Sequence, residues 1–207
     1  MKSKRPINYH APLQPGGIYH VYNRANSNLD LLFQNPGNYF YFLAKYEEYM
    51  GPWVDTIAYC LLPNHFHLLV RIPEEGDLRT LLARLVKWRA YADMALCGVL
   101  SEAFRRFFIA YAKAFNRQQD RRGVLFQRDF RRLLVDSPSY FQTALHYIHA
   151  NPVKHGLCES LEDYPWSSFQ RLLDPDENFL RRDLVLEQVG GVRAYCELHR
   201  EPAPVQA

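Results

Sequence analysis

The segment Leu61–Ile72, LLPNHFHLLVRI, carries two histidines one residue apart within an otherwise apolar run. Successive side chains of an extended strand point to opposite faces, so His65 and His67 share one face while Phe66 and Leu68 occupy the other. Neutral imidazole nitrogens are ligands for divalent metal ions. Buried structural histidines also occur in such pairs, so the pair alone leaves a metal site and a structural role open.

A second polar pair lies on one face of a helix that we predict after Pro138. Tyr147 and Asn151 are four residues apart, which places a phenol and an amide oxygen on the same helical face. If this helix packs against the histidine strand, Asn151 supplies a weak oxygen ligand and Tyr147 lies beside the ion. A core or interface aromatic is the alternative for Tyr147. His149 projects from a different face, which favours a structural hydrogen bond over catalysis.

A basic segment runs from Arg105 to Arg132 and is interleaved with aromatic residues. Its acidic residues are only Asp120 and Asp129. A solvated helix face would explain the charges alone. Phosphate-binding cations beside stackable rings are, however, typical of proteins that bind single-stranded nucleic acid. The interleaved rings are those of Tyr111, Phe115, Phe126 and Phe130.

The composition of the whole chain is that of a globular protein. Its 207 residues are 48% hydrophobic, which is ample for a core, and the net charge of +3 favours nucleic acid only weakly as a partner. The four cysteines form no CxxC pair, as expected of reduced thiols in a cytoplasmic protein. The beginning of the chain lacks the apolar core of a signal peptide, and we expect no membrane span.

Strands and helices alternate in the hydrophobic pattern. Strands are predicted at 18–25, 53–62, 65–72 and 130–135, and helices at 33–50, 78–97, 103–115 and 138–151. The turn signal Pro63-Asn64 joins the second and third strands as a hairpin, and Pro152 is expected to end the last helix. The rest of the chain is predicted to be helical or irregular. One α+β domain with a C-terminal appendage follows from this pattern.

Several ordered motifs resemble those of REP-associated tyrosine transposases, which are single-tyrosine HUH transposases. PNHFHLLV resembles the HUH motif, in which two histidines flank a bulky apolar residue, here Phe66. YIHANPVKHGL closely resembles the YIHxNPVxxGL segment of the same family. Further matches are YHVYNRAN, FNRQQDRRGVLFQRDF and DYPWSSF, so the resemblance spans residues 18–169. The ordered set is far more specific than any one of these motifs.

The resemblance implies a ferredoxin-like or RRM-like antiparallel sheet flanked by helices. A catalytic domain would span residues 18–156, between an N-terminal lead (1–17) and a C-terminal appendage (157–207). By position, His65 and His67 would bind Mg²⁺ or Mn²⁺, and Tyr147 would be the nucleophile. Asn151 would stand where relatives often have glutamine as a third ligand, although asparagine is one methylene shorter. The segment 78–104 is expanded relative to compact members of the family.

The implied activity is that of a metal-dependent transposase. It would cleave and rejoin single-stranded DNA near palindromic, REP-like sequences through a 5′-phosphotyrosine intermediate, as a monomer or homodimer. Two alternatives stay open, a domesticated DNA- or RNA-binding protein without catalysis and an HUH replication initiator or relaxase. Relaxases usually present a third histidine close to the motif, and that cluster is absent here. The candidate DNA-binding residues are Arg24, Arg117, Arg128, Arg131 and Lys154.

Overall fold

A four-stranded antiparallel sheet forms the centre of the computed structural model, which describes residues 8–27 and 31–202. The strands are β1 (Ile18–Arg24), β2 (Asp55–Leu62), β3 (His65–Arg71) and β4 (Arg131–Leu134). Their spatial order is β2-β3-β1-β4, and every pairing is antiparallel. This order with intervening helices is the βαββαβ arrangement of ferredoxin-like folds. The predicted fold class is confirmed.

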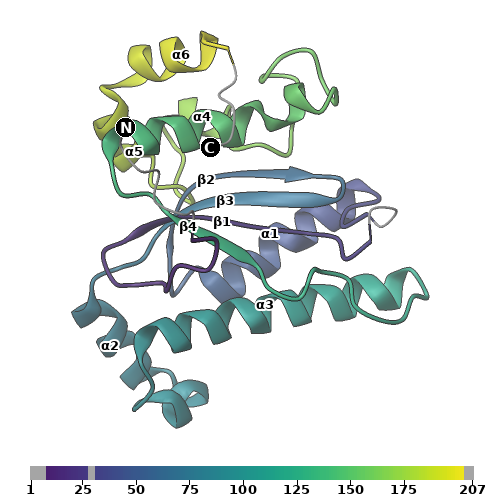
Figure 1. Cartoon of the computed structure of the whole chain (residues 1–207), viewed down its shortest axis with the longest axis vertical. Helices are drawn as coiled ribbons and strands as arrows, with labels where there is room; N and C mark the ends of the chain where they lie inside the picture. The colour runs from purple at the N-terminus through teal and green to yellow at the C-terminus, as the bar shows by residue number, and fades with distance from the viewer. Residues whose placement is uncertain (1–7, 28–30, 203–207) are drawn as a thin grey trace, which may run out of the picture.

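Helices cover both faces of the sheet. Figure 1 shows α1 (Pro36–Met50) and α3 (Leu96–Gln118) on one face and α4 (Pro138–Lys154) on the other. Two shorter helices, α5 (Arg182–Val189) and α6 (Val192–Arg200), pack against α4. The sheet is therefore the middle layer of three.

The alternation of β3 decides which residues reach each layer. Phe66 is fully buried, and its ring centroid lies 5.1 Å from that of Phe42 in α1 and 5.8 Å from that of Phe108 in α3. Burying such a ring stabilises the fold by about 1.5–3 kcal/mol. Because Phe66 is anchored toward α1 and α3, the neighbouring His65 and His67 face α4.

Helix α4 begins at a side-chain cap and ends later than the sequence predicted. The Ser137 hydroxyl accepts a hydrogen bond from the Tyr140 backbone N–H at 3.3 Å. Pro152 does not end the helix, which continues to Lys154. Pro152 removes one backbone hydrogen-bond donor, but the last turn of the helix still forms after it. The helix is closed by Gly156, whose φ of +67° favours glycine.

The expected helix at 78–97 is wrong, because this segment is divided into three pieces. They are α2 (Glu75–Arg84), a 3-10 helix η1 (Val86–Tyr91) and the first turn of α3, which is also longer than the predicted 103–115. Trp88 in η1 packs on Trp53 with ring centroids 4.7 Å apart, and the Arg106 guanidinium lies 4.4 Å from the Trp88 ring. This tertiary packing outweighs the helix-forming composition.

The segment after α4 packs against the outer strand β2. The Leu61 N–H donates to the Trp166 carbonyl at 2.9 Å, and the Tyr59 N–H donates to the Ser168 hydroxyl at 2.8 Å. A short 3-10 helix η2 (Arg171–Leu173) follows before α5. Within residues 8–27 and 31–202, no helix has both the length and the apolar character needed to cross a membrane.

Candidate active site

Three predicted site residues meet between the sheet and α4. The ring centroids of His67 and Tyr147 are 5.5 Å apart with the rings nearly perpendicular, and those of His65 and His67 are 5.2 Å apart. Tyr147 is 9% exposed, so most of its ring is enclosed by neighbours. The antiparallel hairpin and α4 thus bring two distant motifs into one site.

Two buried polar atoms at this site lack a hydrogen-bond partner among the described residues. They are His67 Nε2 and Asn151 Oδ1. The Asn151 amide nitrogen donates to the Tyr147 carbonyl at 2.7 Å, which leaves the side-chain oxygen as an acceptor without a donor. Leaving such an atom unpaired costs about 1–3 kcal/mol. Both atoms can be satisfied by a cation, which fits the ligand roles expected of these residues.

His20 on β1 is a site residue that sequence reasoning missed. Its Nε2 lies 2.9 Å from Nδ1 of His67. If Nδ1 of His67 carries the proton and donates to His20, Nε2 of His67 is left as a lone-pair ligand. The alternation of side chains along β1 puts His20 and Tyr22 on one face. The local sequence pattern does not reveal which residues of β1 pair with which residues of β3, so it could not place His20 beside His67.

Asn64 holds the other histidine in a comparable way. The Asn64 side-chain oxygen lies 2.7 Å from Nδ1 of His65 and can accept a hydrogen bond from its N–H. The Nε2 atom of His65 is then left as the lone-pair nitrogen. Asn64 therefore orients a candidate ligand in addition to forming the hairpin turn.

Burial keeps the site imidazoles neutral. It lowers the pKa of His20 to about 3 and that of His65 to about 4, and together with the adjacent His20 it holds the pKa of His67 well below its ordinary value. Neutral imidazole is the form that binds a metal ion. Burial also raises the pKa of Tyr147, an effect that Asn151 partly offsets. The phenol is therefore protonated at rest.

The donor set available to a metal ion is small and uncharged. Among residues 8–27 and 31–202, no group of three or more histidine, cysteine or acidic side chains could hold a metal ion. Two imidazoles and one amide oxygen, from His65, His67 and Asn151, are the candidate donors. Ligand charge raises the affinity for hard cations, so this neutral set would bind such an ion weakly without a further anionic ligand.

Three of the five predicted DNA-binding cations surround this site. Lys154 Nζ lies 5.2 Å from the centroid of the Tyr147 ring, Arg24 is the cross-strand partner of His65, and Arg131 is the cross-strand partner of Tyr22. The His155 ring also lies 5.1 Å from that of His65. This face of the sheet thus combines imidazoles, a phenol and cations.

The other two cations lie away from Tyr147. Arg117 is exposed near the end of α3, in the layer that covers the opposite face of the sheet. Arg128 lines a pocket beside α3. The structure does not bring either residue to the histidines.

The interleaved aromatic rings of the basic segment are mostly unavailable for stacking on bases. Tyr111, Phe115 and Phe126 are 1%, 3% and 6% exposed and belong to the core, whereas Phe130 is half-buried. The predicted stacking surface is therefore wrong for three of its four rings. The spacing of Tyr111 and Phe115 matches the buried face of α3, and Phe126 packs on that helix from the segment that follows it, with its ring centroid 6.0 Å from that of Tyr111.

His149 has the structural role that its helix face favoured. Its Nε2 lies 2.8 Å from the Ser168 hydroxyl and its Nδ1 lies 2.8 Å from Nε2 of His199 in α6. The side chain is 1% exposed. His149 therefore connects α4 to the C-terminal segment, and its prediction as a structural residue is confirmed.

Sequence comparison identifies a relative with a named activity. The chain is 35% identical over 117 residues to a curated protein of Haemophilus influenzae whose name assigns it to the REP-associated tyrosine transposases. The match covers 56% of this chain and 60% of the relative, so the chain spans about three fifths of the length of that relative. No family model matches the chain.

Comparison of folds identifies a neighbour of the same kind. A solved structure of a REP-associated tyrosine transposase bound to a REP hairpin superposes with a TM-score of 0.60 and covers 86% of this chain and 88% of its own. At 18% sequence identity this similarity shows the shared fold. The two comparisons confirm the resemblance that the sequence motifs indicated.

Proposed function

We propose that this protein is a REP-associated tyrosine transposase, an HUH enzyme that cleaves and rejoins single-stranded DNA through Tyr147. The observation that carries the proposal is the Tyr147 ring packed beside that of His67, at a site where His67 Nε2 and Asn151 Oδ1 are buried without partners among the described residues. The named activity of the Haemophilus influenzae relative supports this reaction class. The hairpin bound by the structural neighbour supports a hairpin-bearing substrate.

The same proposal assigns His65, His67 and Asn151 as ligands of Mg²⁺ or Mn²⁺. Such a cation, when bound, would polarise the scissile phosphate and neutralise charge that develops in the transition state. When His20 and Asn64 accept hydrogen bonds from the Nδ1 atoms of these imidazoles, the Nε2 atoms are left as lone-pair donors to the ion. Because the donor set is neutral, we expect the ion and the DNA phosphate to bind together.

Tyr147 carries the covalent step. Its phenol loses a proton to solvent as the oxygen forms a bond to phosphorus, and the bond from phosphorus to the 3′-oxygen breaks while that oxygen takes up a proton from solvent. The products are a 5′-phosphotyrosyl protein and a strand that ends in a 3′-hydroxyl. A second 3′-hydroxyl can displace Tyr147 later, because the phosphotyrosyl bond retains the energy of the original phosphodiester. No nucleotide triphosphate is needed for rejoining.

The cations around the site suit a single DNA strand laid across the sheet. Arg24, Arg131 and Lys154 border the face that carries Tyr147, where they would bind successive phosphates. Tyr147 is only 9% exposed, so its phenol is more accessible to the phosphate of a flexible unpaired strand than to a stiff duplex. We therefore expect a substrate that is single-stranded at the cleavage position.

Adduct formation tests the nucleophile. Wild-type protein incubated with a labelled hairpin oligonucleotide, single-stranded flanks and Mn²⁺ should give a protein–DNA adduct that resists denaturant, and Tyr147→Phe should give none. Phenylalanine keeps the ring that packs on His67, so the variant should fold. Tyr140→Phe is the matched control, since Tyr140 is a half-buried tyrosine two turns earlier on α4.

The outcomes separate the alternatives. An adduct that persists in Tyr147→Phe would contradict the assignment of Tyr147 as the nucleophile. Oligonucleotide binding without an adduct from wild-type protein would favour the non-catalytic DNA-binding protein. His65→Ala should lose the adduct and keep most oligonucleotide binding in EDTA, and undiminished adduct formation would show that His65 is structural.

A further inference from the structure

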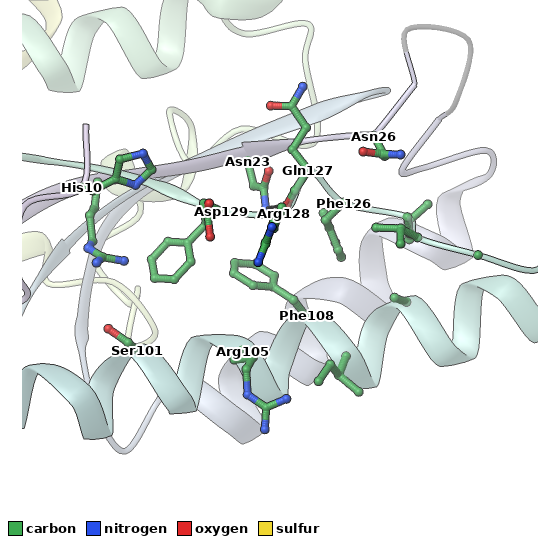
Figure 2. Close-up of a pocket in the computed structure, with 17 residues that line it drawn as sticks. His10, Asn23, Asn26, Ser101, Arg105, Phe108, Phe126, Gln127, Arg128 and Asp129 are labelled. Atoms are coloured by element: carbon green, nitrogen blue, oxygen red, sulfur yellow. Dashed lines mark hydrogen bonds between the residues drawn. The ribbon is translucent and has the colours of Figure 1, made fainter. Parts of the chain in front are cut away.

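A cavity of about 920 Å³ lies on the opposite side of the sheet from Tyr147. Figure 2 shows it between α3 and the segment 123–130 that leads into β4. The cavity is large enough for a nucleoside-sized ligand, since small-molecule sites usually enclose about 300–1,000 Å³. The proposed reaction at Tyr147 uses none of its walls.

The walls are apolar and incompletely covered. Ile109 and Val124 line the cavity while 38% and 63% exposed, and the rings of Phe108 and Phe130 lie beside them with centroids 5.5 Å apart. Exposed apolar side chains grouped in a concave surface are typical of a binding site. A flat aromatic ligand would cover these side chains.

Polar groups at the cavity are free to meet a ligand. Arg128 is exposed, and neither its guanidinium nor the Asn26 amide has a side-chain hydrogen bond or ion pair among the described residues. The other two arginines of the lining are engaged, because Arg105 pairs with Glu102 at 2.6 Å and Arg132 donates to a backbone carbonyl. Arg128 is thus the cation available to an anionic ligand, with the Asp129 carboxylate beside it as a hydrogen-bond acceptor.

The cavity adjoins the end of the strand that borders the active site. The Gln127 N–H donates to the Arg24 carbonyl at 2.9 Å, and the Asn26 N–H donates to the Leu125 carbonyl at 2.8 Å. Arg24 is also the cross-strand partner of His65. Asn26 lies two residues beyond Arg24, which is about 7 Å of extended chain. A DNA strand that passes from the histidines around this end of β1 would therefore approach the cavity.

We propose that this cavity binds an unpaired nucleobase of the DNA strand that Tyr147 cleaves. The base would pack against Ile109, Val124 and the half-buried Phe130 ring, with its polar edge toward Asn26 and Asp129. The Arg128 guanidinium would bind the adjacent phosphate. This assignment rests on the proposed function and adds a second recognition site a few nucleotides from the scissile phosphate.

Two variants with matched controls test the assignment. Ala112→Phe fills the cavity from a half-buried position on α3, and Ala114→Phe makes the same change at a half-buried position of α3 outside the lining. Arg128→Ala removes the free cation without disturbing the core, and Arg122→Ala removes an exposed arginine of the same segment that does not line the cavity. Equal thermal unfolding temperatures within each pair would show that folding is matched.

The measurement is an abasic scan. A hairpin oligonucleotide with randomised six-nucleotide flanks is first selected on the wild-type protein, and the enriched sequence is resynthesised with each flanking base removed in turn. Loss of one base should weaken wild-type binding about fivefold to a hundredfold, as expected for a stacked base. Ala112→Phe should bind the intact DNA about as weakly as wild type binds the abasic DNA, and should show no further loss at that position.

Arg128→Ala should weaken binding of the intact DNA relative to Arg122→Ala, because it removes the phosphate contact. Three results would overturn the assignment. They are a wild-type scan without a sensitive flanking position, an Ala112→Phe variant that keeps the wild-type scan, or an Arg128→Ala variant that binds the intact DNA as tightly as Arg122→Ala. The Tyr147 adduct is measured on the same oligonucleotides, so the two proposals fail separately. If binding depends on one flanking base and on the cavity but no adduct forms, only the transposase reaction is refuted. If an adduct forms but the abasic scan does not depend on the cavity, only the base site is refuted.

Discussion

At the scale of single residues, the site depends on which imidazole nitrogen carries a proton. His67 is buried, with Nδ1 beside His20 and Nε2 without a partner among the described residues. A proton on Nδ1 satisfies that nitrogen and leaves the lone pair at Nε2 for a cation. His20 is therefore a positioning residue for the proposed metal ligand His67. It lies two strands before His67 along the chain but next to it in space.

We predict that His20→Leu weakens Mn²⁺ binding about tenfold to a hundredfold, the usual effect of losing such a partner. His20→Gln should recover part of the affinity, because its side-chain oxygen can accept a hydrogen bond from the N–H of His67 Nδ1. Electron paramagnetic resonance of free Mn²⁺ during a titration measures the change in the presence of single-stranded DNA. A leucine variant that binds Mn²⁺ like wild type, while His67→Ala does not, would contradict the positioning role.

At the scale of elements, α4 is the part that delivers Tyr147 and Asn151 to the sheet. The Ser137 hydroxyl accepts a hydrogen bond from one backbone N–H of its first turn. Its last turn extends past Pro152, so that Lys154 overlies the Tyr147 ring. A helix whose start is capped holds its register against the strands below. The position of the nucleophile thus depends on residues more than two turns away from it.

We predict that Ser137→Ala lowers the free energy of unfolding by about 1 kcal/mol, because an orphan backbone N–H of α4 loses its acceptor. Ser139→Ala is the control, since among the described residues the Ser139 hydroxyl has a hydrogen-bond contact only with Ser137, at 3.4 Å, and Ser139 is the second residue of the helix. Urea unfolding followed by circular dichroism gives both values. Equal stabilities of the two variants would show that the cap contributes nothing.

At the scale of the whole molecule, buried neutral histidines join α4 to the C-terminal helix α6. His149 on α4 contacts His199 on α6, and the ring of His146 lies 5.2 Å from that of His199. Burial lowers the pKa of His199 to about 4 and holds that of His149 well below its ordinary value. Burial also lowers the pKa of His146. Together with the active-site imidazoles, these groups make folding sensitive to acid.

We predict that the protein loses stability as the pH falls from about 6.5 toward 4. In this window the unfolded chain binds protons at histidines that remain neutral in the folded protein. The free energy of unfolding therefore rises with pH through the window and becomes constant above about pH 6.5. His199 contributes up to about 1.4 kcal/mol per pH unit. Urea unfolding in EDTA at pH 7 and 5 tests this, and His199→Gln should have a shallower dependence. The same pH dependence in both proteins would contradict this role of His199.

Local patterns in the sequence predicted the strand pair, the helices at either side and the common face of His65 and His67. They also predicted Tyr147 and Asn151 as neighbours, since a spacing of four is one helical turn whatever the rest of the chain does. The same kind of pattern failed at Trp88 and at Tyr111. At both positions contacts with distant residues decided the local structure or its burial.

The sequence by itself determined which side chains share a face, because strand and helix periodicity depends only on neighbouring residues. Only the tertiary structure decided which faces meet. The register of β1 on β3 brought His20 to His67, the packing of α4 brought Tyr147 to the same place, and the route of segment 123–130 opened a cavity beside α3. These pairings result from burying one continuous core, a free energy that no single segment contains.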